Sequence, residues 1–512
     1  MRRRDLLAGA AALGATLSLT GCASAGRAAG TSADVRLAAM LERHARALRD
    51  EEGGPDSLGG YSLAARAQAR QANAARLAEL NGVDRSVLSP AAALDYDTAR
   101  FVYDAMDDQY GRYGFSDINL RPSPYVVSQM NGAYYWLPDG IAGRSPLANE
   151  ADAERYLDKL RQLVVALDQE TEQIAHDAGL GVVPPAFILA KTVAQIATLR
   201  DMPAASNPLI GPAVARARAA GLNDLESRAA AIFAAQVAPA LTRQMAALDA
   251  LRPRADDRAG VWAKPDGEAY YASGLHSNTT AGYAPAELHR LGLTWVAELT
   301  AEIDRLLRAQ GLTEGSVAAR MSALDRDPRF LKADSDAGRR EIIDYATARL
   351  ARIRNLLPRG FAFVPDLPVE VRRVSPAIEK GAPGGFYSAS SDPAQPSVIY
   401  INLRSVEENA LWRIPTLLHH EGIPGHHFQA SVLKEAGKLS LFRRTVRFSA
   451  WTEGWALYAE QLAAEIGAYD DDPTGRIGYL QGQLFRACRV VVDTGIHHAR
   501  WTREQAIDWM VA

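Results

Sequence analysis

Amphipathic helical periodicity dominates the chain from about residue 35 to residue 360. Apolar residues recur every three or four positions in RLAAMLERHARALRDEE (36–52) and in EADAERYLDKLRQLVVALDQETEQIAHDAG (150–179). Proline and glycine mark the turns between such segments, as in GVVPPAF and RPRADDRAG. This pattern predicts a succession of packed helices over most of the chain.

The pattern changes near residue 360. An alternating run from Val369 to Val374 predicts a strand. A loop rich in Gly, Pro and Ser follows, and a β-branched run from Val398 to Ile401 predicts a second strand. Helical patterns resume at about Glu407. We therefore expect a mainly α protein that contains one small β-sheet.

Length and charge exclude some classes of protein. A chain of 512 residues buries a large core without disulfides or metal staples. Its net charge of −3 is not basic enough to suggest that it binds nucleic acid, so nucleic acid is not an expected partner.

The first residues have the features of an export signal. MRRRDLLAGAAALGATLSLTGC combines arginines, an apolar run too short and alanine-rich to span a membrane well, and a cysteine. Residues 1–22 are expected to be a twin-arginine lipoprotein signal peptide, with Cys22 lipidated, and residues 23–35 a tether. The alternative is a plain secretory signal with a chance cysteine. The expected location is the periplasm, on a lipid anchor, and Ala23 in place of aspartate favours the outer membrane.

The segment TLLHHEGIPGHHFQA (416–430) contains four of the ten histidines. A zinc-peptidase helix places two histidines four residues apart, with glutamate after the first. His420 and Glu421 supply the first half, but Pro424 occupies the place of the second histidine. The next histidines are His426 and His427. The alternative interpretation is a chance histidine cluster or an interface.

A straight helix does not bring these histidines together. Residue 426 would be rotated by about 120° and displaced by about 9 Å from His420, and residue 427 displaced by about 10.5 Å. Pro424 removes a helical hydrogen bond, and Gly425 permits almost any backbone angle. We expect the Pro-Gly pair to widen the turn and return a later histidine to the side of His420.

Glu453 is the candidate third ligand. It lies in FSAWTEGWALYAEQLAAEIG, where a buried carboxylate is costly unless it is paired or metal-bound. Two histidines and one glutamate are typical of a catalytic zinc site, so one Zn²⁺ per chain is expected. The alternative is an amphipathic helix whose polar face carries Glu453 and Glu460.

A charged stripe follows in LQGQLFRACRVVVDTGIHHARWT. Arg486, Arg489, Asp493 and His497 recur every three or four residues on an otherwise apolar helix. His497, hydrogen-bonded to Asp493, is expected to stabilise an oxyanion, and the arginines to bind a substrate carboxylate. A salt-bridged solvent face is the alternative.

Two tyrosines are weaker candidates for substrate binding. Tyr387 precedes the second predicted strand, and Tyr458 lies near Glu453 in the sequence. A phenol often assists zinc-dependent hydrolysis, but tyrosine is also a common core residue.

Several segments resemble one bacterial family. HEGIPGHHFQ, WTEGWALYAE, RACRVVVDTGIHHARWT and the upstream GEAYYASGLHSNTTAGYAPAELHRLGL are similar to the domain of unknown function 885 family, which is grouped with gluzincin-like metallopeptidases. The resemblance covers most of residues 40–512. It implies a mainly helical fold with a zincin-like active-site helix beside the small sheet, a zinc ion and, in many members, a lipid anchor.

The resemblance also implies roles for individual residues. Related oligopeptidases carry a His-Glu-x-Gly-His core, so the alignable step here is Gly425-His426. It implies His420, His426 and Glu453 as ligands and Glu421 as general base, with His427 as the alternative second histidine.

The expected activity is zinc-dependent hydrolysis of short peptides. Glu421 would take the proton of the attacking water and pass it to the leaving amine. The strand from Val398 to Asn402 would align the peptide, residues 36–360 would form a wall that restricts access, and residues 361–512 would form the catalytic region. The alternatives are a non-catalytic metal- or peptide-binding lipoprotein and a zinc hydrolase of other amides or esters. The final residues, TREQAIDWMVA, stop within a helical pattern, which indicates a truncated C-terminus.

Overall fold

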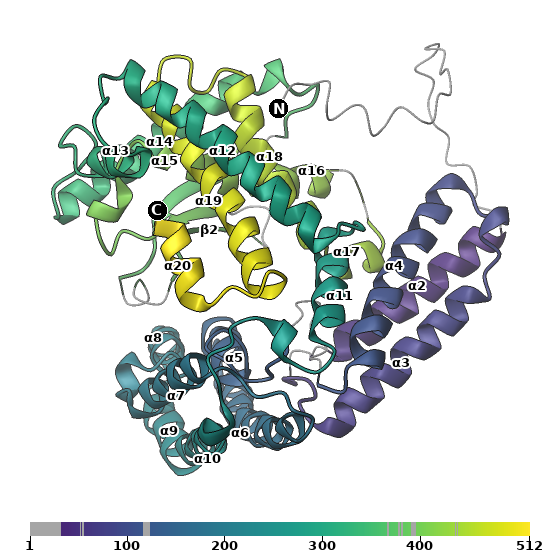
Figure 1. Ribbon diagram of the computed structural model, residues 1–512. Coiled ribbons are helices and arrows are strands. Elements are labelled where there is room, and N and C mark those ends of the chain that lie inside the picture. Colours follow the sequence, from purple (N-terminus) through teal and green to yellow (C-terminus); the bar gives the residue numbers. More distant parts are fainter. Residues whose placement is uncertain are drawn as a thin grey trace.

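The protein is mainly helical with one three-stranded sheet, as predicted (Figure 1). The computed structural model describes residues 32–51, 53, 56–115, 123–365, 368–376, 379, 382–390, 396–435, 437 and 439–511. The expected signal peptide, with Cys22, lies outside these residues. Helix α2 begins at Ser32, within the segment expected to be a tether. In the described part of the chain, no helix has both the length and the hydropathy of a membrane span.

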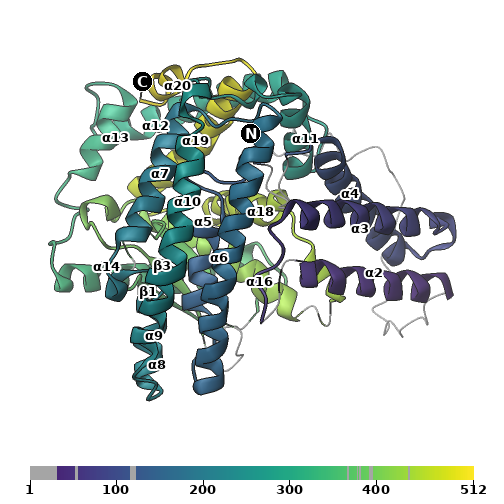
Figure 2. The same cartoon turned by 90° about the horizontal axis from the view of Figure 1, so that it is seen from below.

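Two groups of helices come first along the chain. The purple bundle in Figure 1 has its own apolar core, to which Leu441 and Phe442 of the C-terminal half contribute. The next group shares a second core, and Figure 2 shows its long helices α6, α7 and α10 running side by side. The helices are α2 (Ser32–Glu51), α3 (Leu63–Asn81), α4 (Pro90–Arg112), α5 (Ala133–Pro138), α6 (Glu150–Gly179), α7 (Ala186–Asp201), α8 (Gly211–Ala219), α9 (Leu225–Ile232) and α10 (Ala238–Asp249).

The remaining helices come later along the chain, and most of them share an apolar core with the sheet. The longest pair, α12 and α19, pack against each other along their length (Figure 1). Gly292 permits this close approach, because an added Cβ would lie 2.8 Å from a methyl group of Val491. The helices are α11 (Gly267–Thr279), α12 (Pro285–Ala309), α13 (Val317–Asp325), α14 (Asp336–Leu356), α15 (Ile414–Glu421), α16 (His426–Glu435), α17 (Leu441–Thr445), α18 (Ser449–Glu465), α19 (Pro473–His497) and α20 (Arg503–Val511).

The sheet has the strand order β1-β3-β2. Strand β1 (Val369–Arg373) pairs in parallel with β3 (Ser397–Ile401), and β2 (Gly385–Ser388) pairs antiparallel with its other side. The two predicted strands are present, but β2 lies in the segment expected to be a loop. The role expected for Val398–Asn402 is wrong, because β3 is central and both of its edges are already paired. A bound peptide could pair only with an outer strand.

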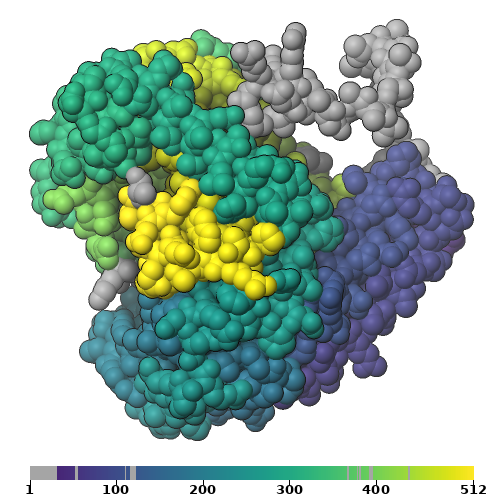
Figure 3. All heavy atoms as spheres, in the orientation of Figure 1, coloured from purple at the N-terminus to yellow at the C-terminus, as the bar shows by residue number. Residues whose placement is uncertain are grey.

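One apolar core contains residues from both sides of residue 360, where the helical wall predicted for residues 36–360 was expected to end. Buried residues of α12, α13 and α14 pack with Ile399 and Ile401 of β3 and with Leu418 of α15. The helices before the sheet therefore share a core with the helices after it, which include the histidine segment. In Figure 3 the C-terminal residues, in yellow, lie between the green residues above them and the teal and blue residues below them.

Candidate metal centre

A break between two helices shapes the histidine segment. Helix α15 ends at Glu421, and α16 begins at His426. The residues between them contain a cis peptide bond, Ile423–Pro424. The predicted disruption at the Pro-Gly pair is therefore present as a complete break rather than as a widened turn within one helix.

Each backbone carbonyl in the break has a hydrogen-bond donor. The carbonyl of Gly422 accepts from the amide of Phe428 at 3.2 Å, and that of Gly425 from the amide of Gln429 at 3.0 Å. The carbonyls of Ile423 and Pro424 accept from side chains. His419 Nδ1 lies 3.1 Å from the carbonyl oxygen of Ile423, and Trp455 Nε1 lies 2.9 Å from that of Pro424. Because buried polar groups are costly when unpaired, this pairing stabilises the break.

Glycine is required at position 425 for a steric reason. A Cβ at this position would collide with the backbone carbonyl oxygens of His419 and His420. Conformational freedom is the reason that the sequence suggests for Gly425, but the close approach of two chain segments is what requires glycine here. This approach brings the start of α16 next to the end of α15.

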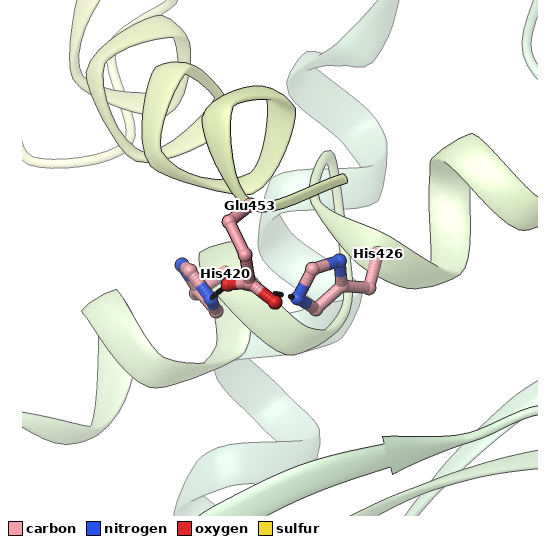
Figure 4. Close-up of side chains that lie close together, drawn as sticks. All are labelled: His420, His426 and Glu453. Carbon is pink, nitrogen blue, oxygen red and sulfur yellow. Dashed lines mark ion pairs between the residues drawn. The ribbon is translucent and has the colours of Figure 1, made fainter. Parts of the chain in front are cut away.

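The break places three candidate ligands together (Figure 4). The imidazole rings of His420 and His426 lie 4.9 Å apart, nearly perpendicular, and the Glu453 carboxylate reaches them from α18. One oxygen of Glu453 lies 3.5 Å from His420 Nε2 and 3.9 Å from His426 Nε2. One donor atom from each residue falls within 4.8 Å of the other two.

This donor set fits a zinc ion. Ligands about 2.0–2.1 Å from a tetrahedral ion lie about 3.4 Å from one another, close to the shorter separations observed here. The side chains of His420 and His426 are 10% and 15% exposed, whereas that of Glu453 is 64% exposed. The cluster is thus enclosed on the histidine side and open on the carboxylate side, as in catalytic zinc sites that keep one position free.

A second carboxylate, that of Glu460, lies behind His420; the sequence pattern placed it on a polar helix face only in the alternative interpretation of Glu453. Glu460 is fully buried, and its Oε1 lies 2.8 Å from His420 Nδ1. Arg486 Nη2 lies 3.1 Å from the same oxygen. The signal that could have identified Glu460 is its spacing of two helical turns from Glu453.

Glu421 borders the cluster and faces the sheet. Its Oε2 accepts a hydrogen bond of 3.1 Å from the backbone amide of Tyr387 in β2. Burial raises the pKa of the Glu421 carboxyl, although His420 opposes this shift. A carboxyl group with a raised pKa is suited to accept a proton near neutral pH.

Two carboxylates govern the electrostatics of the cluster. Burial alone would lower the pKa of His420, but hydrogen bonds to Glu453 and Glu460 raise this pKa to about 9. Burial and the neighbouring His420 lower the pKa of His426. The hydrogen bond from His420 lowers the pKa of Glu453. The proton on His420 thus balances nearby carboxylates, and a metal ion at the same place would do so too.

A family assignment follows from comparison with known proteins. The family described as "Bacterial protein of unknown function (DUF885)" matches residues 45–512. The chain belongs to this family. A crystal structure described as "the putative lipoprotein from Colwellia psychrerythraea" resembles this DUF885 protein with a TM-score of 0.88 and 28% identity, over 94% of this chain and 86% of that chain.

A second structure supports the fold alone. It is described as "a putative lipoprotein of unknown function from Shewanella oneidensis", with a TM-score of 0.63 and 16% identity, over 94% of this chain and 86% of that chain. No curated protein matches the DUF885 chain.

His497 of this DUF885 protein has contacts other than those expected. Its Nδ1 accepts a hydrogen bond of 3.1 Å from the amide of Val261, and its ring stacks on Tyr271 at 5.2 Å. Asp493 accepts from the Tyr271 hydroxyl at 2.6 Å, so the expected pairing of Asp493 with His497 is replaced by contacts with Val261 and Tyr271. His497 also lies about 16 Å along α19 from Arg486, so the described contacts do not bring it to the cluster.

The two arginines predicted to bind substrate lie in different environments. Arg486 is engaged with Glu460 and also donates to the carbonyl of Gly482 at 3.1 Å, which leaves it poorly placed for a substrate carboxylate. Arg489 is exposed and lies over the ring of Phe485 at 5.9 Å. Within the described ranges, no carboxylate forms an ion pair with Arg489, so its charge remains available.

The two candidate tyrosines contact other residues than the three candidate ligands. Tyr458 is 44% exposed, and its ring centroid lies 6.1 Å from that of Trp455. The Tyr387 hydroxyl lies 3.2 Å from Ser397 Oγ and 3.3 Å from His427 Nδ1. His427 therefore points toward the sheet, and His426 is the histidine beside His420.

Proposed function

We propose that this protein is a zinc-dependent hydrolase of peptide bonds. The observation that carries the proposal is the meeting of His420, His426 and Glu453 beside the carboxylate of Glu421. His420, His426 and Glu453 would hold the ion. Bound zinc would supply Lewis-acid activation of a water molecule and of the scissile carbonyl.

Glu421 is the proposed general base. The amide of Tyr387 holds one of its oxygens, so the carboxylate is oriented before substrate binds. The other oxygen is left to take the proton of the attacking water and deliver it to the leaving amine. Burial raises the pKa of Glu421, which makes the carboxylate a stronger base for the first of these two transfers.

The outer edge of β2 supports a peptide as the substrate. The Tyr387 amide points away from β3 toward Glu421, so this edge of the sheet borders the proposed base. An extended peptide could add to this edge by backbone hydrogen bonds and pass beside Glu421. Exposed Arg489 would bind the carboxylate of a short peptide.

A lipid anchor is part of the same proposal. The arginines at residues 2–4 and the sequence LTGC ending at Cys22 support export and lipidation. The similar structure from Colwellia psychrerythraea is described as a putative lipoprotein, which supports lipidation. Loss of membrane attachment in the Cys22→Ala variant, measured by fractionation of cells, would test the anchor separately from the hydrolase.

Metal analysis combined with a peptide-library digest tests the activity. We expect one zinc ion per chain and peptide cleavage that falls by a factor of about 10²–10⁴ in Glu421→Gln, with zinc retained. Glu465→Gln, an exposed change on α18, is the matched control and should leave cleavage unchanged. Zinc without cleavage of any peptide would instead indicate a binding protein, and the absence of zinc would refute the metal site.

A further inference from the structure

Glu460 has an unusual environment for a carboxylate. It is fully buried in α18, although Glu453, two turns earlier on the same helix, is exposed. Removing a charge from water is costly unless partners replace the lost hydration. The partners of Glu460 therefore indicate why a charge is placed here.

Three side chains surround the two oxygens of Glu460. Oε1 lies 2.8 Å from His420 Nδ1 and 3.1 Å from Arg486 Nη2, and Oε2 accepts from Gln483 Nε2 at 3.2 Å. Arg486 Nη2 also lies 3.1 Å from His420 Nδ1. Because a guanidinium can only donate, this contact and a proton on Nδ1 exclude each other, and the shared carboxylate oxygen favours the proton on Nδ1. The guanidinium balances the carboxylate charge, and Gln483 fixes its orientation.

We propose that Glu460 is the positioning residue for His420. When zinc takes the place of the proton on Nε2, Glu460 would keep the other imidazole proton on Nδ1, so that the lone pair of Nε2 is directed at the ion. Arg486 acts through Glu460 and is a positioning residue too, rather than a group that binds substrate. The inference rests on the proposed zinc site, to which it adds the residues that orient its first ligand.

Zinc affinity measured by competition with a chelator tests this role without any substrate. Glu460→Gln keeps the shape of the side chain but removes its charge, and we expect zinc to bind roughly 10–100-fold more weakly. Glu465→Gln, exposed on the same helix, should bind zinc like the wild type. Circular dichroism of the zinc-free variants would check that both are folded.

A double variant separates positioning from a purely structural effect. Glu460→Gln alone leaves the charge of Arg486 without its carboxylate, which could disturb the site nonspecifically. Adding Arg486→Gln removes that unbalanced charge. If Glu460 acts on His420, zinc affinity stays low in the double variant, whereas recovery to the wild-type value would overturn the inference.

The wild-type protein provides a measurement that needs no variant. In the zinc-loaded protein with ¹⁵N-labelled histidine, we expect His420 to carry its proton on Nδ1 and zinc on Nε2. The opposite tautomer would overturn the role of Glu460 while leaving the zinc site intact. A wild-type chain that binds no zinc would refute the proposed function and, with it, this inference.

Discussion

The close approach at Gly425 gives a prediction with a defined magnitude. In Gly425→Ala the new Cβ would collide with the carbonyl oxygens of His419 and His420. These are backbone atoms, so no side chain can rotate to relieve the collision. Overpacking of this kind usually costs about 1–3 kcal/mol, and we expect about 3 kcal/mol because the obstacle is backbone.

Thermal unfolding measures this loss. With about 2.1 cal/mol/K of unfolding entropy per residue, a chain of 512 residues changes its free energy of unfolding by about 1.1 kcal/mol per degree. A loss of 3 kcal/mol would therefore lower Tm by about 3 °C. We also expect weaker zinc binding, because relief of the collision moves His426 away from His420.

Gly454→Ala is the matched control. Gly454 is exposed within α18, next to Glu453, and a Cβ there would meet nothing within 4 Å. Because glycine in a helix costs roughly 0.5–1 kcal/mol relative to alanine, this variant should be slightly more stable than the wild type. The reasoning would be refuted if Gly425→Ala melted at or above the wild-type temperature.

Three further changes have expected outcomes. Trp412 is 1% exposed, so Trp412→Ala should reduce the free energy of unfolding, measured in urea, by about 3–5 kcal/mol. Trp451 is 60% exposed, so Trp451→Ala should change this free energy little. Burial lowers the pKa of His497 in the folded protein, so as pH falls the unfolded chain binds a proton at this residue first, and the free energy of unfolding should decrease below about pH 6.5. His497→Gln should flatten this part of the curve of Tm against pH. A curve that is the same as that of the wild type would contradict the lowered pKa of His497. Arg489→Gln should raise KM for short peptides with a free C-terminal carboxylate but not for amidated ones, and an equal effect on both would count against carboxylate binding.

The sequence predicted most of the helical fold because helical periodicity is a local property. The segment 150–179, for example, forms α6. Strand β2 was missed because GFYS is short and lies among glycine, proline and serine, without an alternating pattern. Its strand state comes from pairing with β3, a contact that local sequence does not encode.

The ligands could be predicted, but their supporting residues could not. Histidine and glutamate spacing, together with the family resemblance, pointed to His420, His426 and Glu453, which the structure brings together. Glu460 and Arg486 reach His420 from two other helices, so their roles depend on how α18 and α19 pack. The stripe on α19 was read as one functional face, but His497 lies too far along the helix to share the contacts of Arg486.

A zinc-edge anomalous diffraction experiment on crystals of the zinc-loaded protein tests the central claim most directly. The account predicts a single strong peak about 2.0–2.2 Å from His420 Nε2, from a ring nitrogen of His426 and from a carboxylate oxygen of Glu453. A peak bound through His427, a peak elsewhere in the molecule, or no peak at saturating zinc would contradict it.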